Sequence, residues 1–171
     1  SFLKQFEVSQ IVVACNTASA WALPTLEKRF SVPILGIILT GLRAALASSR
    51  TQRIGIIGTS ATIRSRAYTN ALLAQSDRIK AFVRACPLLV PLVEEGWTNR
   101  KVTREILEEY LTPLRRHRID TLILGCTHYP LLKPAIRAVV GPKIALVDSA
   151  ESCARFVKER LEHLNLLAKS R

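Results

Sequence analysis

Short apolar runs alternate along this chain with longer segments of mixed polarity. Runs of about four to eight residues rich in Ile, Val and Leu are typical of buried β-strands. They predict strands at 11–15, 32–38, 53–59, 79–86, 119–126 and 143–149. The intervening segments predict helices at 18–30, 41–49, 61–75, 88–95, 103–117, 130–139 and 150–168.

This alternation predicts an α/β fold with a doubly wound parallel sheet, because strands covered by helices on both faces are continuously apolar. Ligands of such sheets bind beyond the carboxyl ends of the strands. Cys15, Thr59 and Cys126 each stand at the end of a predicted strand. We therefore expect the functional site to form where these three residues meet.

The composition agrees with a folded protein, since 49% of the 171 residues are hydrophobic and 22% are charged. No apolar run approaches the ~20 residues that cross a bilayer, and residues 1–10 lack the apolar region of a signal peptide. A cytoplasmic location is therefore expected, with no membrane partner. The sequence contains no Met, which suggests that N-terminal residues are missing from it.

The chain carries a formal net charge of +12, which raises the question of nucleic-acid binding. Its basic segments, "RTQR" at 50–53, "RRHR" at 115–118 and "KERLEH" at 158–163, are scattered along the sequence. No pattern of aromatic residues for base stacking accompanies them. A basic surface on an enzyme is the simpler interpretation, and nucleic acid is not expected to be the main partner.

Two of the four cysteines stand in similar surroundings, in "ACNTASA" at 14–20 and "GCTHYPLL" at 125–132. Each thiol follows an apolar run and is followed by small hydrogen-bonding side chains. A free cysteine often does no more than pack in a core, and the polar residues after it could simply cap a helix. The other two, Cys86 and Cys153, are predicted to be packing residues.

Two thiols at strand ends suit the removal and return of a proton at opposite faces of one carbon. A free Cys titrates near ~8.5, so such a site must lower one pKa or supply a base, and His128 is close to Cys126 in sequence. A disulfide exchanger is the rival interpretation, but it would favour a CxxC spacing that this chain lacks. No spacing of Cys and His indicates a zinc site.

Two further segments are candidates for the site. "GTSATIRS" at 58–65 places Thr59 and Thr62 at a helix start, either as a cradle for an anionic group or as an ordinary helix cap. "LVPLVEEGW" at 89–97 ends in Glu94 and Glu95, which are either solvated or able to orient His128.

The two cysteine motifs resemble the signature motifs of the glutamate racemases, a cofactor-independent family. "IGIIGTSATIRSRAY" at 54–68 and "CPLLVPLVEEG" at 86–96 resemble two further blocks of that family in the same order. The resemblance extends over essentially the whole chain. It implies interconversion of L- and D-glutamate for peptidoglycan synthesis, without cofactor or metal, by a protein that is commonly a homodimer.

The resemblance also implies roles for individual residues. Cys15 and Cys126 match the two catalytic thiols, and His128 matches a residue that assists the second thiol. Glu95, rather than Glu94, is expected to support the site. The positions that match substrate contacts are Asn16, Thr17, Thr59, Thr62, Thr127 and His128.

The family's pattern implies two similar α/β lobes with the site between them. Its Asp-Ser-Gly and Pro-Tyr-Gly segments are not found here, so the N-terminal lobe is expected to be incomplete. Residues 1–38 and 151–171 would belong to that lobe, and residues 39–150 would form the other. The "CTHYP" form favours glutamate, but an aspartate racemase, another amino-acid racemase or an inactive basic binding remnant are alternatives.

Overall fold

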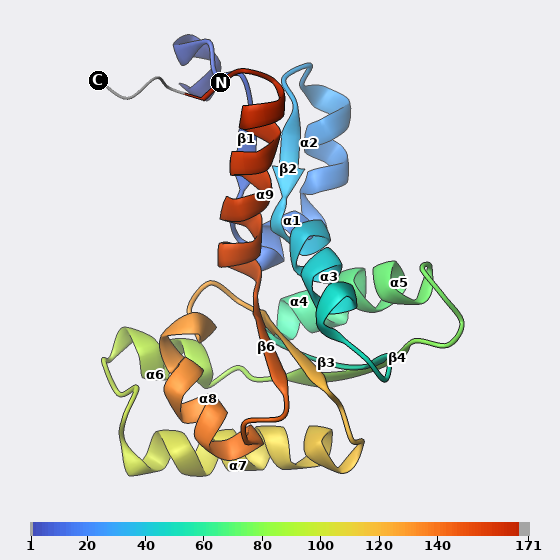
Figure 1. The fold of residues 1–171 in the computed structure, drawn as a ribbon. Helices are drawn as coiled ribbons and strands as arrows, with labels where there is room; N and C mark the ends of the chain where they lie inside the picture. Colours follow the sequence, from blue (N-terminus) through green and yellow to red (C-terminus); the bar gives the residue numbers. More distant parts are fainter. Residues whose placement is uncertain (1, 168–171) are drawn as a thin grey trace.

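The computed structural model describes residues 2–167, in which six strands form two parallel sheets (Figure 1). The smaller sheet pairs β1 with β2, and the larger has the order β4-β3-β5-β6. Within the larger sheet Ile56 lies opposite Val83 on one side and Ile123 on the other. The strands are β1 (Ile11–Val13), β2 (Ile34–Gly36), β3 (Arg53–Gly58), β4 (Lys80–Ala85), β5 (Thr121–Gly125) and β6 (Ala145–Asp148).

Helices surround both sheets. The α-helices are α1 (Asn16–Trp21), α2 (Leu23–Arg29), α3 (Ile37–Ser48), α4 (Ser60–Arg64), α5 (Ala67–Leu73), α6 (Leu89–Glu94), α7 (Lys101–Arg116), α8 (Lys133–Val140) and α9 (Ser149–His163). Two 3₁₀-helices, η1 (Phe2–Phe6) and η2 (Tyr129–Leu132), complete the elements of the described residues.

The alternation of side chains along the strands divides the core of the larger sheet into two layers. Ile57 and Leu124, which are register partners, face a cluster built with α6, α7 and α8. Ile56 and Ile123, also partners, face a second cluster built with α3 and α5. The larger sheet is therefore covered on both faces, which explains why its central strands β3 and β5 are almost wholly apolar and buried, whereas the edge strand β4 contains Lys80 and Arg84.

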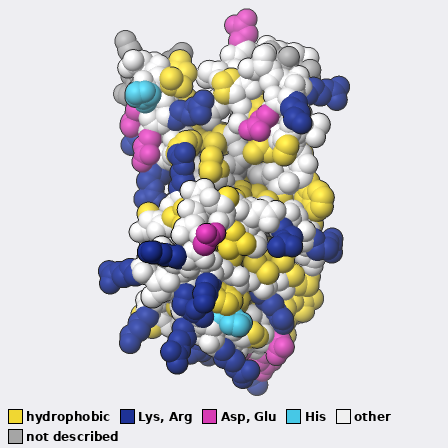
Figure 2. All heavy atoms as spheres, turned by 90° about the vertical axis from the view of Figure 1, so that its right-hand side faces the viewer, with side chains coloured by type: hydrophobic (Ala, Val, Ile, Leu, Met, Phe, Trp, Pro, Cys, Tyr) yellow, Lys and Arg dark blue, Asp and Glu magenta, His cyan; other side chains and the backbone are white. Residues whose placement is uncertain are grey.

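The smaller sheet stands on the larger one beside α1, α2 and α9 (Figure 1). The chain passes between the two sheets twice, through α3 and through β6 into α9, and these two helices pack against each other. Leu35 of β2, Ile37 of α3 and Cys153 of α9 form a small third cluster there. Figure 2 views the molecule from the side on which β3 and β4 begin.

The predicted α/β class and the parallel sheets are confirmed, and several boundaries are corrected. The predicted strand at 32–38 ends at Gly36, because the Ile37 N–H donates to Ser19 Oγ and a helix starts there. The predicted helix at 18–30 is two helices, with Pro24 in the first turn of the second, where its missing N–H is harmless. The helix at 61–75 breaks at Arg66, whose φ is 58°.

The C-terminal predictions also shift. Pro130 lies in η2, and the helix predicted from it begins instead at Lys133. The last helix ends at His163, and residue 168, its predicted end, lies outside the described residues. The expected lobe boundaries, after residues 38 and 150, fall just inside α3 and α9, and the division into lobes stays a prediction.

Asp120 joins the loop before β3 to the start of β5. Its carboxylate accepts hydrogen bonds from Ser49 Oγ, from the backbone N–H groups of Arg50 and Thr51, and from Thr51 Oγ1. Burial opposes ionisation of this carboxyl, but the hydrogen bonds outweigh it and lower its pKa to about 2. The ionised carboxylate therefore stabilises this end of the sheet.

Asp120→Asn is expected to lower the free energy of unfolding at pH 7 by on the order of 1 kcal/mol, because donors aimed at a carboxylate lose their charged acceptor. The folded pKa lies below the unfolded one, so the stabilisation is present above pH ~4 and lost as the pH falls toward 2. Denaturant unfolding of both proteins at pH 7 and pH 3 measures this. The exposed Asp77→Asn is the control, and an equal loss in both variants would contradict the assignment.

Candidate functional site

The three strand ends singled out from the sequence meet around one cavity of about 180 Å³. Cys15 follows β1, Thr59 follows β3 and Cys126 follows β5. The residues that line the cavity are Cys15, Asn16, Thr17, Thr59, Val90, Gly125, Cys126, Thr127 and His128. Of the predicted site residues, only Thr62 and Glu95 are absent from this lining.

Two paired glycines let β3 and β5 approach closely just before the cavity. Gly58 lies opposite Gly125, and a Cβ on Gly125 would stand 2.7 Å from the Ile57 carbonyl oxygen. A larger residue here would push the strands apart. Thr59 and Cys126, the next residues along the two strands, therefore lie side by side.

Cys15 presents the more accessible of the two thiols. It is exposed and stands at the N-cap of α1 with extended backbone, φ −92° and ψ 127°. Its carbonyl accepts the first helical hydrogen bond, from the Ser19 N–H, while its side chain makes no capping bond. The thiol is therefore free to face the cavity.

Cys126 is 6% exposed. Burial raises the pKa of its thiol, and the proximity of Cys15 adds to the rise, while the backbone N–H groups of Thr127, His128 and Tyr129 act in the opposite direction. The net shift is upward, so the protonated thiol dominates at neutral pH. The three N–H groups at the start of η2 nevertheless provide donors for a transient thiolate.

His128 connects this thiol to a carboxylate. Its Nδ1 lies 3.8 Å from Cys126 Sγ, and its Nε2 lies 3.3 Å from Glu94 Oε1. A carboxylate beside Nε2 favours the proton on that nitrogen and leaves the Nδ1 lone pair toward the thiol. The carboxylate beside the imidazole is that of Glu94; Glu95 follows at the end of α6, both glutamates are exposed, and the supporting role expected of Glu95 stays a prediction.

A triangle of hydroxyl groups lies at the cavity, with Thr17 and Thr59 in its lining and Thr62 behind them. Thr17 Oγ1 lies 3.0 Å from Thr59 Oγ1 and 2.9 Å from Thr62 Oγ1, and the latter two are 3.1 Å apart. Thr59 also caps α4 by accepting from the Thr62 N–H, so the helix-cap interpretation is correct as well. The triangle links α1 with the turn after β3.

Asn16 is buried, with 2% of its surface exposed, and both polar atoms of its side chain are bonded within the protein. Its Oδ1 accepts from Tyr68 Oη at 2.7 Å, and its Nδ2 donates to Ser149 Oγ at 3.2 Å. Ser149 in turn donates to the Leu124 carbonyl. Asn16 thus ties α1 to α5 and α9, and a direct contact from its side chain to substrate stays a prediction.

Sequence reasoning did not single out Tyr68 or Ser149, and it left open which of Glu94 and Glu95 would lie beside His128. The available signal was general: a buried amide needs partners of both kinds. Which residues supply them depends on the packing of α5 and α9 against α1. Cys86 and Cys153 are buried as predicted, and burial raises the pKa of the Cys86 thiol to about 12.

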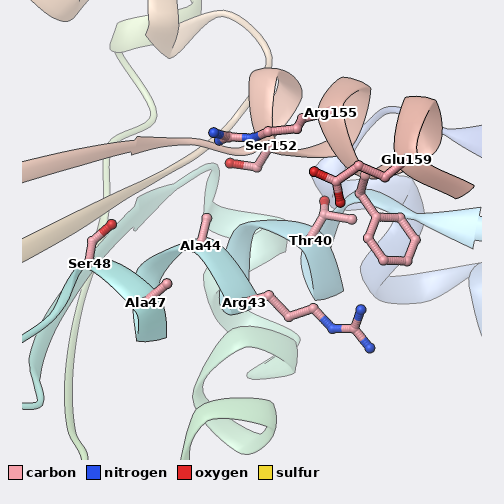
Figure 3. Close-up of a pocket in the computed structure, with 9 residues that line it drawn as sticks. Thr40, Arg43, Ala44, Ala47, Ser48, Ser152, Arg155 and Glu159 are labelled. Carbon is pink, nitrogen blue, oxygen red and sulfur yellow. The ribbon is translucent and has the colours of Figure 1, made fainter.

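A larger hollow of about 380 Å³ lies between α3 and α9 (Figure 3). Thr40, Arg43, Arg155 and Glu159 are among its lining residues, and the Arg43 guanidinium lies 5.1 Å from the Phe156 ring centre. No thiol lines it. Size alone therefore does not identify the reactive site, whereas the smaller cavity brings together the groups capable of acid–base chemistry.

Comparison with known proteins identifies the family of this chain. The family described as Asp/Glu/Hydantoin racemase matches residues 2–157. The chain is 49% identical over 167 residues to a glutamate racemase of Geobacter metallireducens, and 48% identical over 161 residues to that of Syntrophus aciditrophicus. This chain belongs to the Asp/Glu/hydantoin racemase family.

Solved structures of glutamate racemases share its fold. One from Bacillus anthracis superposes with a TM-score of 0.93 at 40% identity, and the superposition covers 99% of this chain and 64% of the Bacillus chain. One from Francisella tularensis, in complex with D-glutamate, gives a TM-score of 0.90 at 30% identity, covering 99% and 63%. The two-lobe racemase fold expected from the sequence is thereby confirmed.

The chain spans about three fifths of the length of the relatives it matches. The alignment with the Geobacter protein covers 98% of this chain and 62% of that protein. The alignment with the Syntrophus protein covers 94% of this chain and 60% of that protein. Across residues 2–167, no helix combines the length and apolar character needed to cross a bilayer.

Tyr68→Phe is expected to lower the free energy of unfolding by about 1–3 kcal/mol, because it leaves the buried Asn16 oxygen without a donor. Thermal or denaturant unfolding measures the change. Tyr110→Phe is the matched control, since the Tyr110 hydroxyl makes no hydrogen bond within residues 2–167. Equal losses in the two variants would show that the Asn16 bond contributes nothing specific.

Proposed function

We propose that this chain carries the reactive site of a glutamate racemase that works by proton transfer between two thiols at the α-carbon. The observation that supports this most directly is that two free thiols, Cys15 and Cys126, line the same cavity. The cavity, about 180 Å³, is small enough to suit an amino acid. The Francisella relative was solved with D-glutamate, which supports glutamate as the substrate.

In the proposed reaction, one cysteine acts as thiolate and removes the α-proton, and its Sγ becomes a thiol. The electron pair left on the α-carbon delocalises into the adjacent carboxylate, which flattens that carbon. The second cysteine, which starts as a thiol, then donates its proton to the opposite face and becomes a thiolate. Atoms and charge balance, and the enzyme is ready for the reverse reaction.

His128 is proposed to make Cys126 available as a base. Burial favours the protonated thiol, so a nearby acceptor is required, and His128 Nδ1 is within reach of Sγ. Glu94 stabilises the imidazolium that forms when the proton moves. Cys15 has no comparable histidine beside it in the described residues, so the two thiols are activated differently.

Substrate recognition is proposed for the hydroxyls around the cavity. Thr17, Thr59 and Thr62 can rotate their O–H groups toward a carboxylate, and Thr127 lies beside the second thiol. Donors held in place before the reaction stabilise the charge that develops in the transition state. The role of Asn16 in this scheme is to hold α1, and with it Cys15, in position.

The wider parts of the proposal rest on the family resemblance. The proposed role is to supply D-glutamate for peptidoglycan synthesis, and thereby for cell wall biogenesis and cell shape. The proposed protein is cytoplasmic, forms a homodimer and works without a cofactor. An aspartate racemase is the second candidate within the family. The His128–Glu94 pair favours glutamate, because the resemblance places a histidine at this position in glutamate racemases.

Cys15→Ser and Cys126→Ser are each expected to lower the racemisation rate by at least ~10³-fold, because a serine hydroxyl is far too weak an acid to replace the thiol. Circular dichroism of L- and D-glutamate measures the rate in the full-length gene product that contains this sequence. Cys153→Ala should keep nearly full activity, because this thiol packs between α3 and α9. Normal rates in either serine variant would exclude the two-thiol mechanism.

Glu94→Gln is expected to lower kcat/KM on the order of tenfold, less than the ~10²–10⁴ contributed by a general base itself. Loss of the carboxylate makes the His128 imidazolium less stable, so a thiolate at Cys126 forms only at higher pH. The acidic limb of the kcat/KM profile should therefore move to higher pH. Glu95→Gln is the matched control, and a shift in that variant instead would confirm Glu95, rather than Glu94, as the supporting residue.

A further inference from the structure

The N-terminal edge of the larger sheet collects basic side chains that are far apart in the sequence. Strands β3, β4 and β5 are parallel neighbours, so their first residues meet at one edge, opposite the edge that carries Thr59 and Cys126. We call this surface the basic edge. It consists of Arg50, Arg53, Arg78, Lys80, Arg116 and Arg118.

The register brings two of the separate basic segments into contact. Arg53 lies directly opposite Lys80 in the sheet. On the other side, the Asp120 N–H donates to the Arg53 carbonyl, and Arg53 Nε donates to the His117 carbonyl at 2.7 Å. The segments 50–53 and 115–118, scattered in the sequence, are therefore neighbours in the fold.

The charge of the basic edge is not neutralised locally. Within residues 2–167, none of its six side chains belongs to an ion pair. Asp120 and Asp77 lie among them, but the Asp120 carboxylate is already bonded to the loop before β3, and Asp77 is a single exposed residue. Arg116 also lines a hollow with Glu105, Glu108 and Glu109 of α7, without an ion pair to any of them. Dark-blue side chains gather accordingly over the lower half of the face in Figure 2.

Aromatic rings are present at the centre of this surface. The rings of Phe82 and His117 stack with centroids 4.3 Å apart, and the Arg53 guanidinium lies 5.0 Å from the Phe82 ring centre. Stacking and the bond to His117 hold this guanidinium in place. Its two terminal nitrogens make no hydrogen bond with the described residues and can reach an external acceptor.

We propose that the basic edge binds the phosphodiester backbone of a nucleic acid, as a second function separate from the racemase site. Neighbouring strands are ~4.8 Å apart, so three strand starts spread the charges over about 10 Å. A nucleic-acid strand presents a phosphate every ~3.4 Å along its axis, so the edge can contact several at once. The exposed His117 ring offers a surface for an unpaired base.

An anionic membrane is the less suitable partner. Membrane-surface binding combines basic residues with exposed Trp, Phe or Leu that enter the lipid. None of the large exposed hydrophobic side chains of the described residues falls in 49–53, 76–82 or 115–120. The surface is therefore charged without an apolar anchor, which favours a polyphosphate chain in water.

The test is binding of a fluorescein-labelled oligonucleotide, single-stranded or duplex, followed by anisotropy over a range of salt concentrations. The unmodified protein is expected to bind with Kd of about 10⁻⁴–10⁻⁶ M, weakening steeply with salt, with a log–log slope near −0.9 for each phosphate contacted on a duplex. The variant Lys80→Glu, Arg116→Glu, Arg118→Glu should bind at least tenfold more weakly and with a shallower slope.

A charge-matched control distinguishes a specific contribution of the basic edge to binding from the effect of net charge alone. Lys28→Glu, Arg29→Glu, Arg155→Glu also changes three exposed residues and lowers the net charge from +12 to +6. This control should weaken binding less than threefold. Equal losses in the two variants, or no binding by the unmodified protein at low salt, would overturn the proposal.

Two further measurements complete the design. Vesicles of anionic phospholipid test the membrane alternative, and binding to vesicles but not to the oligonucleotide would overturn the proposal. Circular dichroism checks that both variants are folded. If the charge-reversal variant of the basic edge is not folded, the neutral variant Lys80→Gln, Arg116→Gln, Arg118→Gln is tested in its place. Racemisation should be unchanged in all of them, because the basic edge contains no residue of the cavity.

Discussion

Every strand pair in the two sheets of this molecule runs parallel, and this constraint determines where its chemistry lies. Within the larger sheet the parallel strands all end at one edge, so Thr59 after β3 and Cys126 after β5 lie side by side there, and the smaller sheet places Cys15, after β1, at the same cavity. Paired glycines at the ends of β3 and β5 bring the strands close enough for Thr59 and Cys126 to share a wall. The same constraint gathers the strand starts, and with them the basic side chains, at the opposite edge.

Placement of Cys15 depends on a second layer of interactions. The smaller sheet has only two short strands, and such a unit has little stability of its own. Asn16 connects it to the larger sheet through Tyr68 and Ser149, and the threonine triangle connects α1 to α4. These polar contacts are specific in direction. They position Cys15 relative to Cys126, in addition to the apolar packing between α3 and α9.

The two thiols have different surroundings although their sequence motifs are similar. Cys15 is exposed, whereas Cys126 is buried, carries a raised pKa and has His128 and Glu94 beside it. A thiol that is hard to ionise is useful as an acid, and it becomes a base only when a neighbour accepts its proton. The asymmetry suits a reaction in which one thiol must be protonated while the other is not.

The sequence by itself determined the α/β class, the parallel strands and the strand-end positions of Cys15, Thr59 and Cys126, because these follow from local apolar runs and their spacing. It also contained the family resemblance, which the comparisons confirm. Only the tertiary structure decided that Glu94 lies beside His128, because both glutamates at the end of α6 are exposed and which of them meets the imidazole depends on how α6 packs beside η2. It likewise decided the partners of Asn16 and the clustering of basic residues, since both depend on which strands become neighbours, and that is a property of the sheet order rather than of any single segment.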